Sequence, residues 1–277
     1  LQLIGMLALF VLLPLWMFSC FIVTQRHTLK LARQLEQFLP TGSNLVTSIK
    51  QFPMRNVLLG LAAGVIYALV FNVPSSQYEG FWRGNPAVIT IFLGQVLVWA
   101  SVGFLLGIRL HVVGVFRQAG EVMELSLFEQ SNLSPFARVG MLDVAIIVGA
   151  MAVATVQSLD AQFRVENYLT ALLVAVPAGA ALLLRPMWSL HRRLRGRKLE
   201  LLEDVNTRIA SLPETGDDQD MQLLESLLQR RDRVRELPTL PLDMGVWSRL
   251  AVYILIPPLA WAGAALMEVM VSNWLGV

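Results

Sequence analysis

Long apolar runs with few charged residues alternate with polar stretches along this chain. Six of the runs are long enough to cross a bilayer as helices, because about 20 residues at about 1.5 Å each span a hydrocarbon core of roughly 30 Å. They cover residues 3–23, 56–73, 87–108, 141–158, 169–190 and 248–272. This pattern predicts an all-α integral membrane protein with six transmembrane helices.

Basic side chains fall almost entirely in three of the polar stretches. Of the 22 lysines and arginines, all but Arg83 and Arg164 lie in or beside the three connections that follow the first, third and fifth apolar runs. Because loops rich in lysine and arginine stay in the cytoplasm, we predict that these three connections are cytoplasmic and that both termini are extracytoplasmic. The opposite connections, around Glu79, Asp160 and Glu166, are weakly acidic. The expected location is a bacterial inner membrane, with anionic lipid headgroups attracted to the basic face.

Composition agrees with a membrane protein. Apolar residues make up 55% of the chain and charged residues only 15%, which excludes an ordinary soluble domain. The single cysteine, Cys20, lies inside the first apolar run, so neither an intramolecular disulfide nor a cysteine metal cluster can form. We expect almost the whole chain to be membrane domain.

An internal repeat surrounds the three histidines. Each histidine follows the first, third or fifth apolar run and is itself followed six residues later by a basic residue. The pairs are His27 with Arg33, His111 with Arg117, and His191 with Arg197. We predict three parallel helical hairpins with a period near 84 residues, the spacing of the first two histidines. Convergence is the alternative, because any hairpin facing the cytoplasm acquires basic residues at its helix ends.

The third repeat is longer than the others, and its extra residues have the pattern of two helices. The apolar positions recur at helical spacing in two segments: Leu194, Leu201, Val205, Ile209 and Leu212, then Met221, Leu224, Leu228 and Val234. We therefore divide the chain into transmembrane helices one to five with short connections (1–190), a cytoplasmic helical hairpin (191–247) and transmembrane helix six (248–277). Val122, Leu125 and Phe128 predict a further short amphipathic helix at the inner interface.

Two pairs of glycines mark a close helix contact. Gly60 and Gly64 lie four residues apart in the second apolar run, and Gly103 and Gly107 do so in the third. Small residues at this spacing allow backbones in a membrane to approach closely. Because the two helices are antiparallel neighbours with their glycines at matching depth, we predict a seam inside the chain rather than a dimer interface.

Few ionisable residues lie within the apolar runs, which makes each of them a candidate for function. Asp143 and Arg185 lie within one or two turns of the cytoplasmic boundary and can pair or extend to the headgroups, and we favour a structural ion pair. Glu268 lies near the outer end of the sixth run. None of the three lies near the midplane, so proton-coupled transport is not favoured.

Three prolines interrupt the last two apolar runs. They are Pro177 in the fifth and Pro257 and Pro258 in the sixth. Each removes a backbone hydrogen bond and frees a carbonyl one turn earlier, which can kink the helix or line a cavity. We expect kinks, since membrane helices commonly tolerate proline.

Neither a metal site nor a cofactor is expected. The three histidines lie at one membrane face, where they could converge on one ion with Glu36 or Glu121 adding a carboxylate. No two of them have the i, i+4 spacing of a helical metal site. The sequence also lacks a phosphate-binding loop, a serine elbow and an HExxH motif, so we do not expect an enzyme.

These observations favour a non-enzymatic membrane protein that acts as an assembly, scaffold or sensory subunit. Its partners are expected to be anionic lipids, further copies of itself or another membrane protein; nucleic acid is not expected, because the arginine-rich stretch directly follows a helix end. The expected contact residues are His27, Arg33, His111, Arg117, His191, Arg192, Arg193 and Arg197. The alternative is a homo-oligomeric ion channel or uniporter with a pore lined by the sixth helix.

Overall fold

A computed structural model describes residues 4–40, 44–123, 133–159, 165–212 and 218–237, together with ten separate positions between Ser248 and Met270. Every regular element in this part of the chain is a helix. Five segments are long and apolar enough to cross a membrane: Ile4–Glu36, Met54–Asn72, Pro86–Val122, Ser134–Gln157 and Leu169–Ala210. The chain is therefore an all-helical protein of the membrane-spanning type. Most of the predicted sixth span, with Pro257, Pro258 and Glu268, lies outside the described residues, and the positions described within it are helical.

The helices follow one another along the chain with short connections. They are α1 (Ile4–Glu36), α2 (Leu45–Lys50), α3 (Met54–Tyr67), the π-helix η1 (Ala68–Asn72), α4 (Ser75–Trp82), α5 (Pro86–Val122), α6 (Ser134–Ala154), the 3-10 helix η3 (Thr155–Leu159), α7 (Val165–Ala210) and α8 (Asp218–Glu236). The predicted amphipathic helix with Leu125 and Phe128 lies outside the described residues, and Val122 is the last residue of α5.

The helices α1, α5 and α7 continue well beyond the ends of their apolar runs. The sequence predicts that the first two basic stretches are connections, and this is wrong, because their basic residues extend α1 and α5. In the third stretch, where the sequence predicts a helix, α7 continues without a break. Residues 24–36 and 109–119 contain no proline that would end the helix, and residues 24–36 are rich in strong helix formers such as arginine, leucine and glutamine. We call the end of the bundle at which α1 and α5 terminate the basic end, and the opposite end, near Asn72 and α4, the far end.

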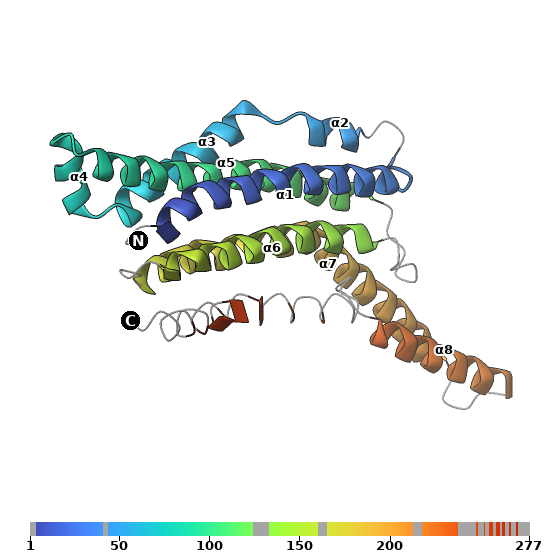
Figure 1. Cartoon of the computed structure of the whole chain (residues 1–277). Helices are drawn as coiled ribbons and strands as arrows, with labels where there is room; N and C mark the ends of the chain where they lie inside the picture. The colour runs from blue at the N-terminus through green and yellow to red at the C-terminus, as the bar shows by residue number, and fades with distance from the viewer. Residues whose placement is uncertain are drawn as a thin grey trace.

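Four helices form the body of the bundle. Both α5 and α6 pack against α1 and against α7, which places α1 and α7 at opposite corners (Figure 1). The helix α3 lies on the outside of α5, with which it makes an extensive contact. The helices that follow each other across the basic end, α1 with α3 and α5 with α6, make little contact within the described ranges. The predicted arrangement as three hairpins is thus not confirmed.

The four glycines lie where the backbones of α3 and α5 meet. A Cβ atom added to Gly60 would lie 2.8 Å from the Cα of Gly107, and one added to Gly103 would lie 2.8 Å from the backbone nitrogen of Gly64. Backbone atoms have no rotamer by which to move away, so only glycine fits here. The structure thus brings both glycine pairs together inside the chain, as a seam.

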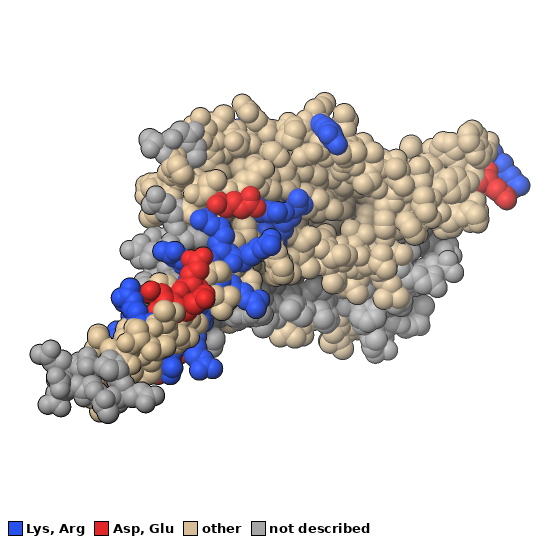
Figure 2. Space-filling view, turned by 180° about the vertical axis from the view of Figure 1, so that it is seen from behind, with Lys and Arg blue, Asp and Glu red and all other residues tan. Residues whose placement is uncertain are grey.

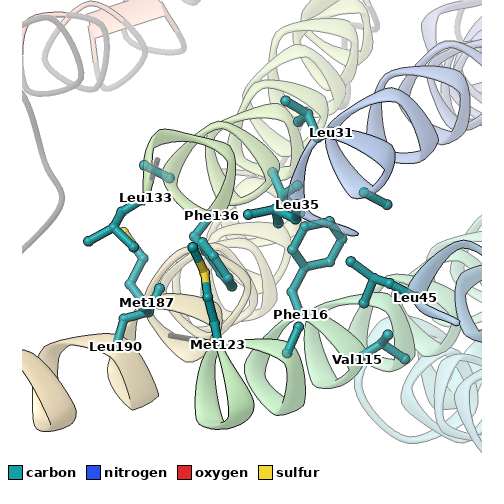
Figure 3. Packing of buried hydrophobic residues seen from close by; sticks show 14 of the residues in the cluster. Leu31, Leu35, Leu45, Val115, Phe116, Met123, Leu133, Phe136, Met187 and Leu190 are labelled. Atoms are coloured by element: carbon teal, nitrogen blue, oxygen red, sulfur yellow. The ribbon is translucent and has the colours of Figure 1, made fainter. Parts of the chain in front are cut away.

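A dense apolar cluster fills the bundle at its basic end. Leucine, phenylalanine and methionine side chains from α1, α5, α6 and α7 point toward one another there (Figure 3). At its centre the rings of Phe116 and Phe136 meet edge to face, with centroids 5.9 Å apart, and both are fully buried. Leu35 and Leu190 complete a layer without accessible surface. This cluster closes the basic end of the bundle.

Beyond the bundle, the last part of α7 pairs with α8. Leu194, Val205, Leu227 and Val234 are buried between the two helices or against the bundle. The predicted stripe of the second helix is correct for Val234 and wrong for Met221, which is 65% exposed, because the buried face of α8 includes Leu227 instead. Lys198 ties the base of the pair together, because its Nζ donates to the carbonyl oxygens of Arg235 and Leu237 at 2.6 and 2.8 Å. We call this unit, residues 191–237, the hairpin (Figure 1).

Candidate functional site

A buried ion pair joins three helices at the level where the apolar runs end. Arg109 Nε of α5 donates to Asp143 Oδ1 of α6 at 2.5 Å, and the two side chains are 5% and 1% exposed. Arg109 Nη1 also donates to Thr28 Oγ1 of α1 at 3.3 Å. Burying two charges requires good geometry and further hydrogen bonds, so these contacts fix the relative positions of α1, α5 and α6.

The predicted pairing of Asp143 with Arg185 is wrong, because Asp143 pairs with Arg109. The sequence places Arg109 just past the end of the third apolar run, where a loop is expected. Because α5 continues to Val122, Arg109 instead faces the interior of the bundle. Arg185 has an exposed side chain and lines a groove among α3, α5 and α7. The sequence does contain an indication of this pair, because Arg109 and Asp143 both lie at an end of an apolar run, on the same predicted face of the membrane.

The ion pair uses only part of its hydrogen-bonding capacity. Within the described residues, Arg109 Nη2 and Asp143 Oδ2 are buried and have no hydrogen-bond partner. A guanidinium and a carboxylate can form two parallel hydrogen bonds, and here one of the two is made. A free donor and a free acceptor of the same ion pair therefore remain in the interior, where unsatisfied polar groups are costly.

Arg109 and Asp143 also line one end of a cavity. The cavity runs along the centre of the four-helix body, and about 160 Å³ of it can hold the centre of a water molecule. Its lining on α5 extends from Arg109 to Gln95, and on α6 and η3 from Asp143 to Gln157. Each of these pairs is fourteen residues apart, which corresponds to about 21 Å along a helix. The cavity is therefore long and narrow.

The walls of the cavity are apolar along most of this length. Representative lining residues are Leu13, Met17, Val98, Val102, Ile147 and Ala178. Among the described lining residues, polar groups occur near the two ends: the ion pair toward the basic end, and Gln95, Asn72 and Gln157 toward the far end. Gln95 is buried, and its Oε1 has no partner among the residues described. Past the ion pair, the apolar cluster separates the cavity from the basic end.

Several of the residues predicted to contact lipid or partners make contacts within the chain. His111 Nε2 lies 3.2 Å from the carbonyl oxygen of Ser48, and the His191 ring lies beside Trp188. Two residues form exposed ion pairs along their own helices, Arg117 with Glu121 and Arg197 with Glu200. His27, Arg33 and Arg192 have exposed side chains on the surface of the basic end. These last three side chains are therefore accessible to lipid headgroups.

Arg193 fastens the start of the hairpin to the end of α5. Its Nη1 donates to the carbonyl oxygens of Gly120 and Met123 at 2.8 and 2.9 Å. The last carbonyls of a helix lack intrahelical partners and carry partial negative charge, so a guanidinium satisfies them well. Ser189 Oγ adds a hydrogen bond to the carbonyl oxygen of Arg117 at 3.1 Å. Together these bonds join α7 to α5 where α7 leaves the bundle.

We expect Arg193→Gln to loosen this joint. Losing hydrogen bonds from a charged donor is expected to destabilise the end of α5 by about 1.5 kcal/mol. Hydrogen–deuterium exchange of peptides covering residues 112–123 should become faster, while the rest of the bundle is unchanged. The matched control is Arg192→Gln, which removes the neighbouring exposed arginine and should leave exchange as in the wild type. Equal exchange in both variants would contradict this role of Arg193.

Pro177 and the three histidines lie within the described residues, whereas Pro257 and Pro258 do not. Helix α7 passes through Pro177, whose ring is exposed, and through Pro186 without ending. In the described ranges, no group of three or more His, Cys, Asp or Glu side chains is placed to hold a metal ion. Glu36 instead accepts a hydrogen bond from the backbone nitrogen of Val46 at 2.9 Å.

Comparison with known proteins adds no identity. No family model, no curated protein and no solved structure matches this chain. The features of this chain that bear on function are the ion pair, the cavity and the hairpin.

Proposed function

We propose that this protein is a non-enzymatic sensory or assembly component of a bacterial inner membrane, with its basic end in the cytoplasm. One observation carries the proposal: α7 is a single unbroken helix that lines the cavity from Ala171 to Leu182 and then forms the first arm of the hairpin. A change in the packing around the cavity would therefore be transmitted along one helix to a surface outside the bilayer.

The hairpin and the bundle are connected by one continuous helix, which would move as a rigid element. From Leu182 to Ala210, α7 extends about 42 Å at about 1.5 Å per residue. Its base is fastened to α5 by Arg193 and to the end of α8 by Lys198. Because its buried residues contact those of α8, a movement of α7 in the bundle would displace the hairpin as one body.

The surface of the hairpin fits an interaction role. Charged side chains gather over the hairpin and the neighbouring basic end, whereas a broad uncharged surface covers most of the rest of this face (Figure 2). Among these charges, Met221 and Leu223 of α8 are 65% and 48% exposed. Exposed apolar side chains within a charged surface are typical of protein interfaces. The basic residues around Arg192 would contact anionic headgroups.

Photo-crosslinking in intact cells tests this role. A photoreactive residue at position 223 is expected to give a recurring protein adduct of a single mass, either with a partner or with a second copy of the chain. The control is the same residue at Leu173, which is 70% exposed on the apolar part of α7 and should react with lipid only. Absence of a protein adduct from position 223, or the same adducts from both positions, would contradict the proposal.

The alternative of a homo-oligomeric channel depends on the sixth helix, with Pro257, Pro258 and Glu268. Those three residues lie outside the described ones, so the channel stays a prediction. Proteoliposome flux that is abolished by Glu268→Gln would favour it over an assembly role.

A further inference from the structure

The cavity is lined at one end by two residues with unpaired polar atoms, and the proposed association of the hairpin with partners does not require these atoms. A free donor, Arg109 Nη2, and a free acceptor, Asp143 Oδ2, belong to side chains that are more than nine-tenths buried and that line its end. They are the unused half of a two-bond pair. One oxygen atom that both accepts and donates a hydrogen bond would satisfy both.

We propose that this cavity binds a single-chain lipophilic molecule with an uncharged hydroxyl-bearing head, such as a long-chain alcohol. The hydroxyl oxygen accepts a hydrogen bond from Arg109 Nη2 and donates one to Asp143 Oδ2. The hydrocarbon chain extends from there toward Gln95 and the far end. This binding site is independent of the proposed role of the hairpin in association.

The charge of the site selects an uncharged head. Arg109 and Asp143 neutralise each other, and the cavity contains no further ionisable side chain among its described lining residues. A carboxylate or an ammonium placed there would be an uncompensated charge in an apolar interior, which is far more costly than a hydrogen-bonded hydroxyl. An alkane, in contrast, would leave both polar atoms unsatisfied.

The shape of the cavity selects a chain. A water needs roughly 10–15 Å³ by the same measure of volume, so a space of about 160 Å³ corresponds to about 11–16 waters between mostly apolar walls. A buried water needs two to four polar partners, and the described lining of this cavity supplies polar groups only near its two ends. A hydrocarbon chain instead removes its own apolar surface and that of the walls from contact with water.

The surrounding bilayer supplies both the ligand and a route to the site. A second hollow of about 510 Å³ lies among α3, α5 and α7. Trp99, Val102, Leu106 and Val174 line both the hollow and the cavity. One layer of side chains between α5 and α7 therefore separates the two spaces, and a chain can enter between these helices.

Binding of defined probes to the purified full-length protein tests the site. The probe is 1-dodecanol, compared with dodecane, dodecanoate and dodecylammonium at equal concentration in the same detergent. We expect close to one dodecanol retained per chain after gel filtration, above empty micelles. We also expect the melting temperature to rise by about 5 °C or more at saturation, with little effect from the other three probes.

Filling the cavity should abolish this binding. Ala178→Leu adds volume to a lining residue of α7, and the matched control Ala180→Leu adds the same volume on the exposed face of the same helix. Ala150→Leu, from the α6 wall, serves if Ala178→Leu does not fold. Loss of dodecanol from the filled variant and its retention by Ala180→Leu would support the site. Equal retention by all variants, or equal or stronger binding of dodecane or a charged probe, would overturn it. No binding of dodecanol to the wild type would also overturn it, and would leave water as the occupant.

Discussion

Replacing Arg109 by methionine is expected to lower the free energy of unfolding by about 3–5 kcal/mol. The substitution keeps the apolar part of the side chain but leaves the carboxylate of Asp143 buried without its partner. Removing one member of a buried ion pair is strongly destabilising, because the remaining charge is uncompensated in the interior. Equilibrium unfolding in mixed micelles, followed by circular dichroism, measures the change.

Two comparisons separate this effect from a general intolerance of substitution. Arg117→Met removes an arginine from the same helix, but its ion pair with Glu121 is half exposed, so the expected loss is at most about 1 kcal/mol. The double variant Arg109→Met with Asp143→Leu removes both charges and should recover most of the stability, as apolar replacements of buried pairs often do. A single-variant loss no larger than that of Arg117→Met would contradict the buried pair.

Gly103→Ala is expected to cost about 1–3 kcal/mol, the usual range for adding volume to a packed interior. The new methyl group would meet the carbonyl oxygen of Gly60 and lie 2.8 Å from the backbone nitrogen of Gly64. Neither can move without separating α3 from α5, so the whole contact between the helices would loosen. Thermal unfolding in detergent should show the loss as a lower melting temperature.

The control for the glycine seam lies on the same helix. A methyl group added at Gly114 of α5 meets no atom within 4 Å. Gly114→Ala should therefore be neutral or raise stability by up to about 1 kcal/mol, because alanine favours the helix over glycine. If both alanine variants behaved alike, the seam would not be the reason for the effect at Gly103.

The features that the sequence predicts well are those with a short-range signature. Apolar length alone identifies the five described spans, since the hydrocarbon thickness sets the number of residues. Four-residue glycine spacing at matching depth anticipates the contact of Gly60 and Gly64 with Gly103 and Gly107. Helical periodicity likewise anticipates that Val205 and Val234 are buried in the hairpin.

The features that the sequence does not predict depend on where helices end and on which helices are neighbours. Hydropathy marks the edge of the bilayer, whereas α5 ends fourteen residues beyond Ile108, so Arg109 was assigned to a connection rather than to the interior. Order along the chain suggests that α1 pairs with α3, but α1 instead packs on α5 and α6. The cavity results from the packing of four helices, and no sequence pattern within a single helix predicts a cavity.

Native mass spectrometry of the protein, extracted gently from its own membrane into nanodiscs, tests the proposed role most directly. The wild type should be found in a stoichiometric complex, with another protein or with copies of itself, and the Met221→Asp and Leu223→Asp double variant should be monomeric. Gln222→Asp places the same charge between these two positions and should keep the complex. A wild type that is monomeric without a partner, or a double variant that retains the wild-type complex, would contradict the role assigned to the hairpin.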